Sequence, residues 1–146
     1  MLPLLPGDSS GGALGIDSGL IAGWSGGGGA EHAVVWIIGD DGVAVRELPV
    51  PAAAADCQRA QATSKTRVVG RCALPGGKPI AVVWANGDGA EPWGDIHVLQ
   101  PLDGDEVAIA YAMSGDLVVG ASATVFGNTL SSRPAAWRLP AARGAE

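Results

Sequence analysis

The stretch "GIDSGLIAGWS", Gly15 to Ser25, joins a turn sequence to a short apolar run and a further glycine. Its Asp-Ser-Gly, residues 17–19, supplies residues that tolerate the positive φ of a tight hairpin turn. The apolar triplet 20–22 has the composition of a short buried strand. Gly23 removes a side chain where a neighbouring strand comes close. The stretch therefore predicts a β-hairpin.

Related text occurs twice more, as "AQATSKTRVVGRC" and "AYAMSGDLVVGAS". The glycines that follow the apolar triplets are Gly23, Gly70 and Gly120, which are 47 and 50 residues apart. A variable loop follows each glycine, and then comes an apolar segment that ends in tryptophan. These tryptophans are Trp36, Trp84 and Trp137. A fixed period of this length is the mark of a repeat architecture.

Each unit holds four short strand candidates: a Leu-Pro segment, an Ala-x-Ala segment, the segment before the glycine, and the tryptophan segment. Four antiparallel strands every 40 to 50 residues is typical of a propeller blade. We therefore predict an all-β, β-propeller-like array of three four-stranded antiparallel repeats in a single domain, 1–146. The units cover approximately 2–42, 43–90 and 91–140, and a C-terminal tail covers 141–146.

Twelve strands counted in this way begin with a Leu-Pro strand and end with a tryptophan strand. A blade counted from the Ala-x-Ala strand leaves a spare strand at the N-terminus and a third blade without its last strand. Because propellers have about four to eight blades, we expect either a homodimer that closes a six-bladed ring, each chain lending its first strand, or an open arc. The Ala-rich segment 51–66 is the one helix candidate, with Pro51 in its first turn.

Composition restricts the partners. The chain has a net charge of −6, with nine basic and fifteen acidic residues, so nucleic acid is a poor partner. No apolar run approaches the roughly 20 residues that a membrane helix needs, and we expect no membrane insertion. The first twelve residues lack the basic segment of a signal peptide, so a leader for export is not visible in this chain.

The segments "GIDSGLIAGWS", "EHAVVW" and "VRELP" together resemble the HAF repeats of bacterial extracellular proteins. That family's pattern is Ala-x-x-Ile-Asn-x-x-Gly-x-Val-Val-Gly-x-Ser, a loop, His-Ala-Phe-x-Trp, and Leu-Gly-x-Leu. The third copy, "AMSGDLVVGAS" with "RPAAW", is also similar, whereas the second lacks the turn glycine and the histidine. The resemblance implies a β-propeller-like fold and an extracellular or periplasmic location.

Cys57 and Cys72 lie symmetrically about a point between Ser64 and Lys65 in the second copy. A regular hairpin there would place both side chains on one face and close together. A disulfide would stabilise the fold by ~3 kcal/mol in the chain-entropy model, and the oxidising compartment that the resemblance implies favours it. The alternative is two buried free thiols. Two cysteines without a neighbouring histidine do not indicate a zinc site.

Two tryptophans, Trp24 and Trp93, lie outside the repeated position and could stack on a sugar or contact a partner. For Trp93 the alternative is a loop anchor that folds back onto its own blade. His32 and His97 are the only histidines, and no Ser-His-Asp arrangement can be argued for them. We expect them to be packing or strand-face residues.

Three acidic turns could suggest calcium: 39–42, 86–91 and 102–106. None follows the twelve-residue calcium loop with its closing glutamate, and hairpin turns favour Asp, Asn and Gly without a metal. We therefore expect neither a metal nor another cofactor.

The sequence thus suggests a non-catalytic extracellular binding module of HAF-repeat type, with a glycan or a protein as its ligand. The candidate contact residues are Trp24, Trp93, His97 and His32, and we expect no catalytic residue. One alternative is a secreted propeller hydrolase or lyase with its site at the mouth of the ring. Another is a structural fragment of a longer repeat protein.

Overall fold

The computed structural model describes residues 1–64, 66–86, 92–126 and 128–140. In these ranges the chain forms eleven strands, arranged as three antiparallel sheets, and no helix. The all-β prediction is confirmed. Within the same ranges, no helix has the length and hydrophobicity that a membrane span requires.

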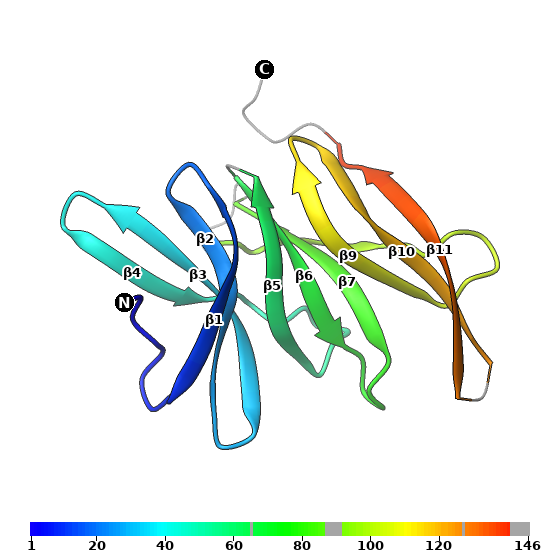
Figure 1. Cartoon of the computed structure of the whole chain (residues 1–146), viewed down its shortest axis with the longest axis horizontal. Helices are drawn as coiled ribbons and strands as arrows, with labels where there is room; N and C mark the ends of the chain where they lie inside the picture. The colour runs from blue at the N-terminus through cyan, green and yellow to red at the C-terminus, as the bar shows by residue number, and fades with distance from the viewer. Residues whose placement is uncertain (65, 87–91, 127, 141–146) are drawn as a thin grey trace.

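The strands follow one another in space as they do in the chain. Sheet A comprises β1 (Ser10–Asp17), β2 (Leu20–Gly27), β3 (Ala30–Gly39) and β4 (Gly42–Glu47). Sheet B comprises β5 (Asp56–Ser64), β6 (Arg67–Ala73), β7 (Pro79–Ala85) and β8 (Asp95–Leu99). Sheet C comprises β9 (Val107–Ser114), β10 (Leu117–Phe126) and β11 (Thr129–Arg138). The sheets stand side by side like a fan, with sheet B in the middle (Figure 1).

The sheets do not coincide with the units predicted over 2–42, 43–90 and 91–140. Each sheet begins one strand later than the corresponding unit. Each sheet begins at the Ala-x-Ala segment, so sheet A covers 10–47 and sheet B covers 56–99. Sheet C has three strands in the described residues. The predicted tail, 141–146, lies outside the described residues.

The hairpin predicted from the opening stretch is present. Asp17 pairs with Leu20, and the two residues between them have positive φ, 52° at Ser18 and 80° at Gly19. Gly23 lies opposite Ala13, and a Cβ atom at Gly23 would overlap the carbonyl oxygen of the neighbouring strand. The repeated glycine is therefore a close-approach position.

One predicted strand and the one helix candidate are absent from the described residues. Residues 1–9 form no strand until β1 begins, because prolines at positions 3 and 6 remove the N–H groups that a ladder needs. The Ala-rich segment 51–66 is not helical either, since most of it forms β5, whose buried residues Cys57 and Ala60 face the core. Tertiary packing overrides the helix propensity of alanine there.

The N-terminal segment packs on sheet A as the linker 48–55 packs on sheet B. Trp36 Nε1 donates a hydrogen bond to the carbonyl oxygen of Pro3 at 2.6 Å, and Trp84 Nε1 donates to that of Pro49 at 2.8 Å. In sheet C, Trp137 Nε1 donates to the carbonyl oxygen of Gln100 at 2.7 Å. The repeated tryptophan thus fastens each sheet to the chain segment that precedes it.

The two larger core clusters lie between the sheets. The core between sheets A and B contains Leu20, Ala22, Ala33, Val35, Leu48, Cys57, Ala60, Val68, Cys72, Val82, Trp84 and Trp93. The core between sheets B and C contains Val69, Ala81, Val83, Leu99, Ala108, Ala110, Val118 and Leu139. Both faces of sheet B therefore contribute to a core, which explains the continuous apolar run of its central strand β7.

Candidate functional site

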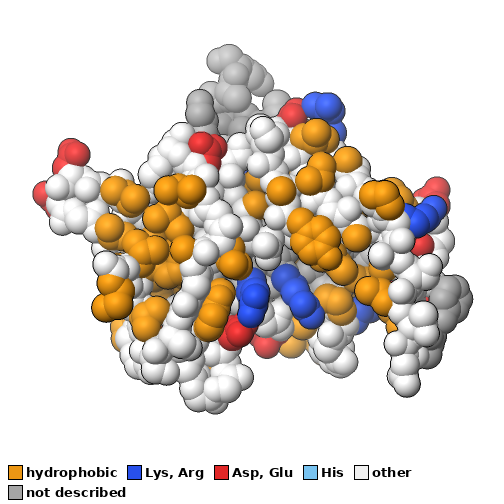
Figure 2. Space-filling model, in the orientation of Figure 1, with side chains coloured by type: hydrophobic (Ala, Val, Ile, Leu, Met, Phe, Trp, Pro, Cys, Tyr) orange, Lys and Arg blue, Asp and Glu red, His pale blue; other side chains and the backbone are white. Residues whose placement is uncertain are grey.

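A groove with a volume of about 820 Å³ lies between sheet B and sheet C. Its floor includes small side chains of β7 and β9, among them Ala81, Ala108 and Ala110. Its polar side chains are Glu31, Gln58, Arg59, Gln61, Arg71 and Tyr111. Basic side chains gather in the middle of the face over sheet B, with hydrophobic side chains around them (Figure 2). A concave site with apolar walls and a few polar groups is typical of ligand-binding sites.

The groove lies beside a position at which the repeats differ. The residue after the repeated glycine is Trp24 in sheet A and Arg71 in sheet B. Trp24 is half-buried on the side of sheet A that faces sheet B, and the guanidinium of Arg59 lies 5.5 Å from the centre of its ring. Arg71, by contrast, is exposed. At this position sheet A therefore presents a half-buried indole toward sheet B, and sheet B presents an exposed guanidinium to the groove.

Of the two arginines that line the groove, Arg59 has an ion-pair partner among the described residues and Arg71 has none. Arg59 Nε lies 3.2 Å from Glu31 Oε2, and its Nη2 lies 3.4 Å from Glu31 Oε1. This bidentate pair balances one positive charge with one negative charge. Among the described residues, no hydrogen bond or ion pair engages the guanidinium of Arg71. The groove therefore carries one uncompensated positive charge on a chain whose net charge is −6.

Two further groups in the groove are suited to contact a ligand. The Oε1 atom of Gln58 is buried and has no hydrogen-bond partner among the described residues, although its Nε2 donates to Asp56 Oδ1 at 2.6 Å. A buried acceptor without a donor costs about 1–3 kcal/mol. Tyr111, on β9, is 57% exposed. Its ring offers a flat apolar surface with a hydroxyl group at one end.

Trp24 lies next to this groove through its contact with Arg59, but the other candidate residues predicted from the sequence lie elsewhere. His32, on β3, lies 3.5 Å from Glu47, and His97, on β8, lies 3.2 Å from Asp95. Both are surface residues that do not line the groove. The structure does not bring the predicted contact residues together into one site.

Trp93 is 4% exposed and belongs to the core between sheets A and B. Its backbone N–H donates to Asn86 Oδ1 at 2.8 Å, and its φ is 62°. A ligand has no access to a side chain buried in this way. The placement fits the alternative interpretation, that Trp93 is a loop anchor that folds back onto its own blade, since its core neighbours include Trp84 of sheet B.

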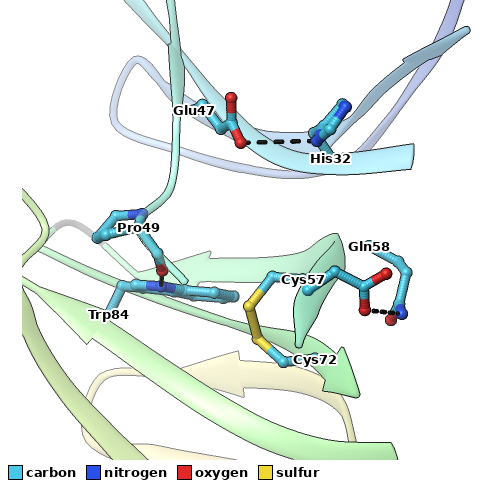
Figure 3. Close-up of a disulfide and its surroundings, with 8 residues drawn as sticks. His32, Glu47, Pro49, Cys57, Gln58, Cys72 and Trp84 are labelled. Carbon is cyan, nitrogen blue, oxygen red and sulfur yellow. Dashed lines mark hydrogen bonds and ion pairs between the residues drawn. A yellow bond between two sulfur atoms is a disulfide. The ribbon is translucent and has the colours of Figure 1, made fainter. Parts of the chain in front are cut away.

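Cys57 and Cys72 form a disulfide between directly paired residues of β5 and β6. The prediction from their symmetric spacing is confirmed, and both side chains are buried. Figure 3 shows the bridge beside Trp84, whose indole N–H points to the carbonyl of Pro49. Disulfides persist in oxidising environments, so this bridge indicates a compartment of that kind.

The acidic turns have structural roles where they are described. The carboxylate of Asp105, in the turn 102–106, accepts hydrogen bonds from Ser122 Oγ at 2.6 Å and Thr124 Oγ1 at 2.7 Å. These bonds, with a third from Arg133 and that residue's charge, lower the pKa of Asp105 to about 2.

Of the other two acidic turns, one is described in full and one only in part. The turn 39–42 joins β3 to β4, and most of the segment 86–91 lies outside the described residues. Among the residues that are described, no three His, Cys, Asp or Glu side chains gather in a way that could hold a metal ion.

Sequence reasoning did not single out Arg71 or Tyr111. A signal for Arg71 was available, because it replaces Trp24 at the equivalent position of the repeat. No sequence pattern marks Tyr111, which lies at a β-bulge of β9, where Gly120 pairs with Ala110 and Val119 pairs with Ala112. Comparison with protein family models, with curated proteins and with solved structures found no match to this chain.

Proposed function

We propose that this chain is a non-catalytic extracellular binding module whose ligand, a glycan, occupies the groove between sheets B and C. The observation that carries the proposal is the exchange of Trp24 for Arg71 at one position of the repeat. At this position sheet A presents a half-buried indole toward sheet B, and sheet B presents an exposed charge to the groove. A scaffold alone has no need of that difference.

The chemistry of the groove supports binding over hydrolysis. Glycoside hydrolysis ordinarily uses two carboxyl groups that flank the scissile bond. Glu31 is the only carboxylate among the described residues that line the groove, and Arg59 holds it in a bidentate ion pair. A secreted hydrolase or lyase is therefore the less favoured function.

The shape of the groove supports a glycan over a protein partner. Stable protein interfaces bury more than about 1,000 Å² over broad surfaces, whereas a groove of about 820 Å³ matches the size of small-ligand sites. The exposed ring of Tyr111 is suited to pack against the apolar face of a sugar.

The experiment is a binding assay on immobilised oligosaccharides with a variant that fills the groove. Arg71→Trp places in sheet B the residue that occupies the equivalent position in sheet A, and we expect it to abolish binding. Lys78→Ala is the matched control, because Lys78 is exposed in the turn after β6 and does not line the groove. Binding that survives Arg71→Trp would place the ligand elsewhere.

For the assembly, the proposal is that the three sheets are blades of a β-propeller-like ring of HAF-repeat type, closed by a second copy. The outer face of sheet C supports it: Val119 is 42% exposed, whereas the equivalent Ala22 and Val69 are buried under the next sheet. Sheet C also lacks a strand equivalent to β4 and β8 in the described residues. Light scattering at micromolar concentration should give a dimer mass, and a monomer mass would contradict ring closure.

The location proposed for this module is extracellular or periplasmic. The buried Cys57–Cys72 bridge supports this location, because thiols are kept reduced in the cytosol. Thiol labelling of the denatured protein, isolated from its native host without reductant, should find both cysteines unreactive. Labelling of both cysteines would contradict an oxidising compartment.

A further inference from the structure

We infer that the groove selects a sugar that carries a carboxylate, and that Arg71 is the residue that binds this carboxylate. The inference rests on the proposed function, because it names the ligand class of the same groove. It is drawn from two groups that lack partners within the described residues: a cation without an anion and a buried acceptor without a donor.

The cation is placed in an unfavourable setting. Arg59 and Arg71 are directly opposite each other on β5 and β6, and like charges in that relationship are destabilising. Glu31 compensates Arg59 from sheet A at 3.2 Å. An anion in the groove would give Arg71 the partner that Arg59 already has. The groove is therefore prepared for one negative charge.

A carboxylate fits this cation better than a diffuse anion does. The guanidinium is planar and presents paired N–H donors that match the two oxygens of a carboxylate. The chain around it has fifteen acidic residues against nine basic ones, so a highly charged polyanion is repelled at longer range. This combination favours a ligand with a compact, local charge.

The acceptor adds a second requirement. Gln58 Oε1 is buried without a hydrogen-bond donor in the described structure, and a carboxylate cannot donate to it. A hydroxyl group can. A ligand that satisfies both groups carries a carboxylate and a hydrogen-bond donor, and a uronic acid with its hydroxyl groups has this pattern.

The walls of the groove fit the rest of such a sugar. Tyr111 offers an exposed ring, and Val125 and Leu130 form a directly paired apolar patch on β10 and β11. A pyranose has one or two faces of C–H groups that pack against surfaces of this kind. Hydrophobic side chains lie next to the basic ones on this face (Figure 2).

The test is calorimetry with three matched probes: a galactose disaccharide in which one residue is galacturonic acid, its methyl ester, and the neutral galactose disaccharide. The ester keeps the shape of the acid and removes its charge. We expect the wild-type chain to bind the acid roughly tenfold or more tightly than the ester, as one charge-assisted contact implies. Arg71→Gln should remove that preference, while Lys78→Gln, with the same change of charge, should leave the preference intact.

The outcomes separate the inference from the function on which it rests. Equal binding of acid and ester, or an unchanged preference in Arg71→Gln, overturns the inference and leaves a glycan-binding module. Equal binding of tetraglutamate through Arg71 overturns the sugar as ligand class. Binding of none of the three saccharides overturns both. Urea unfolding of each variant checks that any loss of binding is not a loss of folding.

Discussion

Cys72 in sheet B occupies the position that Ser25 occupies in sheet A, two residues after the repeated glycine. The buried hydroxyl of Ser25 donates to Asp8 Oδ2 at 2.7 Å and accepts a hydrogen bond from the backbone of Leu5 at 3.1 Å. The same place in sheet B holds one half of a disulfide. The equivalent buried position of the repeat thus makes hydrogen bonds in sheet A and a covalent bond in sheet B.

Sheet C repeats the polar version. Ser122 Oγ donates to Asp105 Oδ2 at 2.6 Å and accepts from the backbone N–H of Leu102 at 2.8 Å. In sheet B the residue equivalent to the aspartate is Ala54, whose N–H bonds to Pro51 as that of Asp105 bonds to Leu102. Where the aspartate is present, the serine–aspartate hydrogen bond attaches the linker to its sheet. In sheet B the disulfide joins β5 to β6 instead.

We expect removal of the bridge to destabilise the chain by ~3 kcal/mol, because a closed loop of 15 residues loses this much unfolded-state entropy. The variant is Cys57→Ala with Cys72→Ala, measured by urea unfolding. Reductant should lower the stability of the wild-type chain and leave the double variant unchanged. Equal stability of the two proteins without reductant would contradict this account.

The serine–aspartate hydrogen bond of sheets A and C should be transferable to sheet B. In a background of Cys57→Ala and Cys72→Ser, the further change Ala54→Asp should restore about 1 kcal/mol, the usual contribution of one hydrogen bond. The comparison is between the chain with and without Ala54→Asp. No gain in the urea midpoint would show that the backbone at Ala54 does not orient an aspartate as it does at Asp105.

Acid should weaken the hydrogen bonds that Ser122 and Thr124 donate to the carboxylate of Asp105 in sheet C. Hydrogen bonds from Ser122 and Thr124 lower the pKa of Asp105 to about 2 from 3.8, so the ionised form is favoured in the folded state. The stability that this provides is complete above pH 3.8 and is lost as the pH falls to about 2. Asp105→Asn should make the unfolding free energy change less with pH across this window. Asp41→Asn, in the exposed β3–β4 turn, is the control, and an identical reduction there would contradict the assignment.

The repeated glycine should not tolerate a side chain. A Cβ atom at Gly70 would overlap the carbonyl oxygen of Arg59 on the paired strand. We expect Gly70→Ala to destabilise the chain by about 1–3 kcal/mol, as overpacking does. Gly39→Ala is the control, because the nearest atom to its added Cβ is 3.8 Å away. Thermal unfolding of both variants measures the difference, and equal melting temperatures would refute the close-approach role.

The hydrogen bond donated by the repeated tryptophan should contribute most to stability where the indole is buried. Trp84 is fully buried and bonds to the carbonyl oxygen of Pro49, whereas Trp137 is only partly buried and bonds to that of Gln100. Replacement by Phe removes the donor in both cases. We expect Trp84→Phe to cost about 2 kcal/mol, because a part-buried carbonyl loses its donor, and Trp137→Phe, whose hydrogen bond is exposed, to cost less. The reverse order in urea unfolding would contradict this reasoning.

The local elements were predictable from the residues. The turn 17–19, the strands on either side of it and the disulfide all depend on pairing within one hairpin. Positive φ and period-two alternation leave their mark on neighbouring residues, so the spacing of Cys57 and Cys72 was enough to predict their contact.

The relations between sheets were not predictable in this way. Residues 1–9 form no strand but lie on sheet A as a linker, and Trp93 turns into the core from a loop. Whether a side chain is buried at such places depends on which surface is next to it. That surface comes from a unit far away in the chain.

The sequence by itself determined the repeat, its hairpins and the bridge, because hydrogen-bonded pairing acts between residues that are close along the chain. It also showed that Trp24 and Arg71 differ at one repeated position. Only the tertiary structure decided what that difference means, since both side chains face a neighbouring sheet. There sheet A presents a half-buried indole toward sheet B, and sheet B presents an exposed, positively charged guanidinium to the groove.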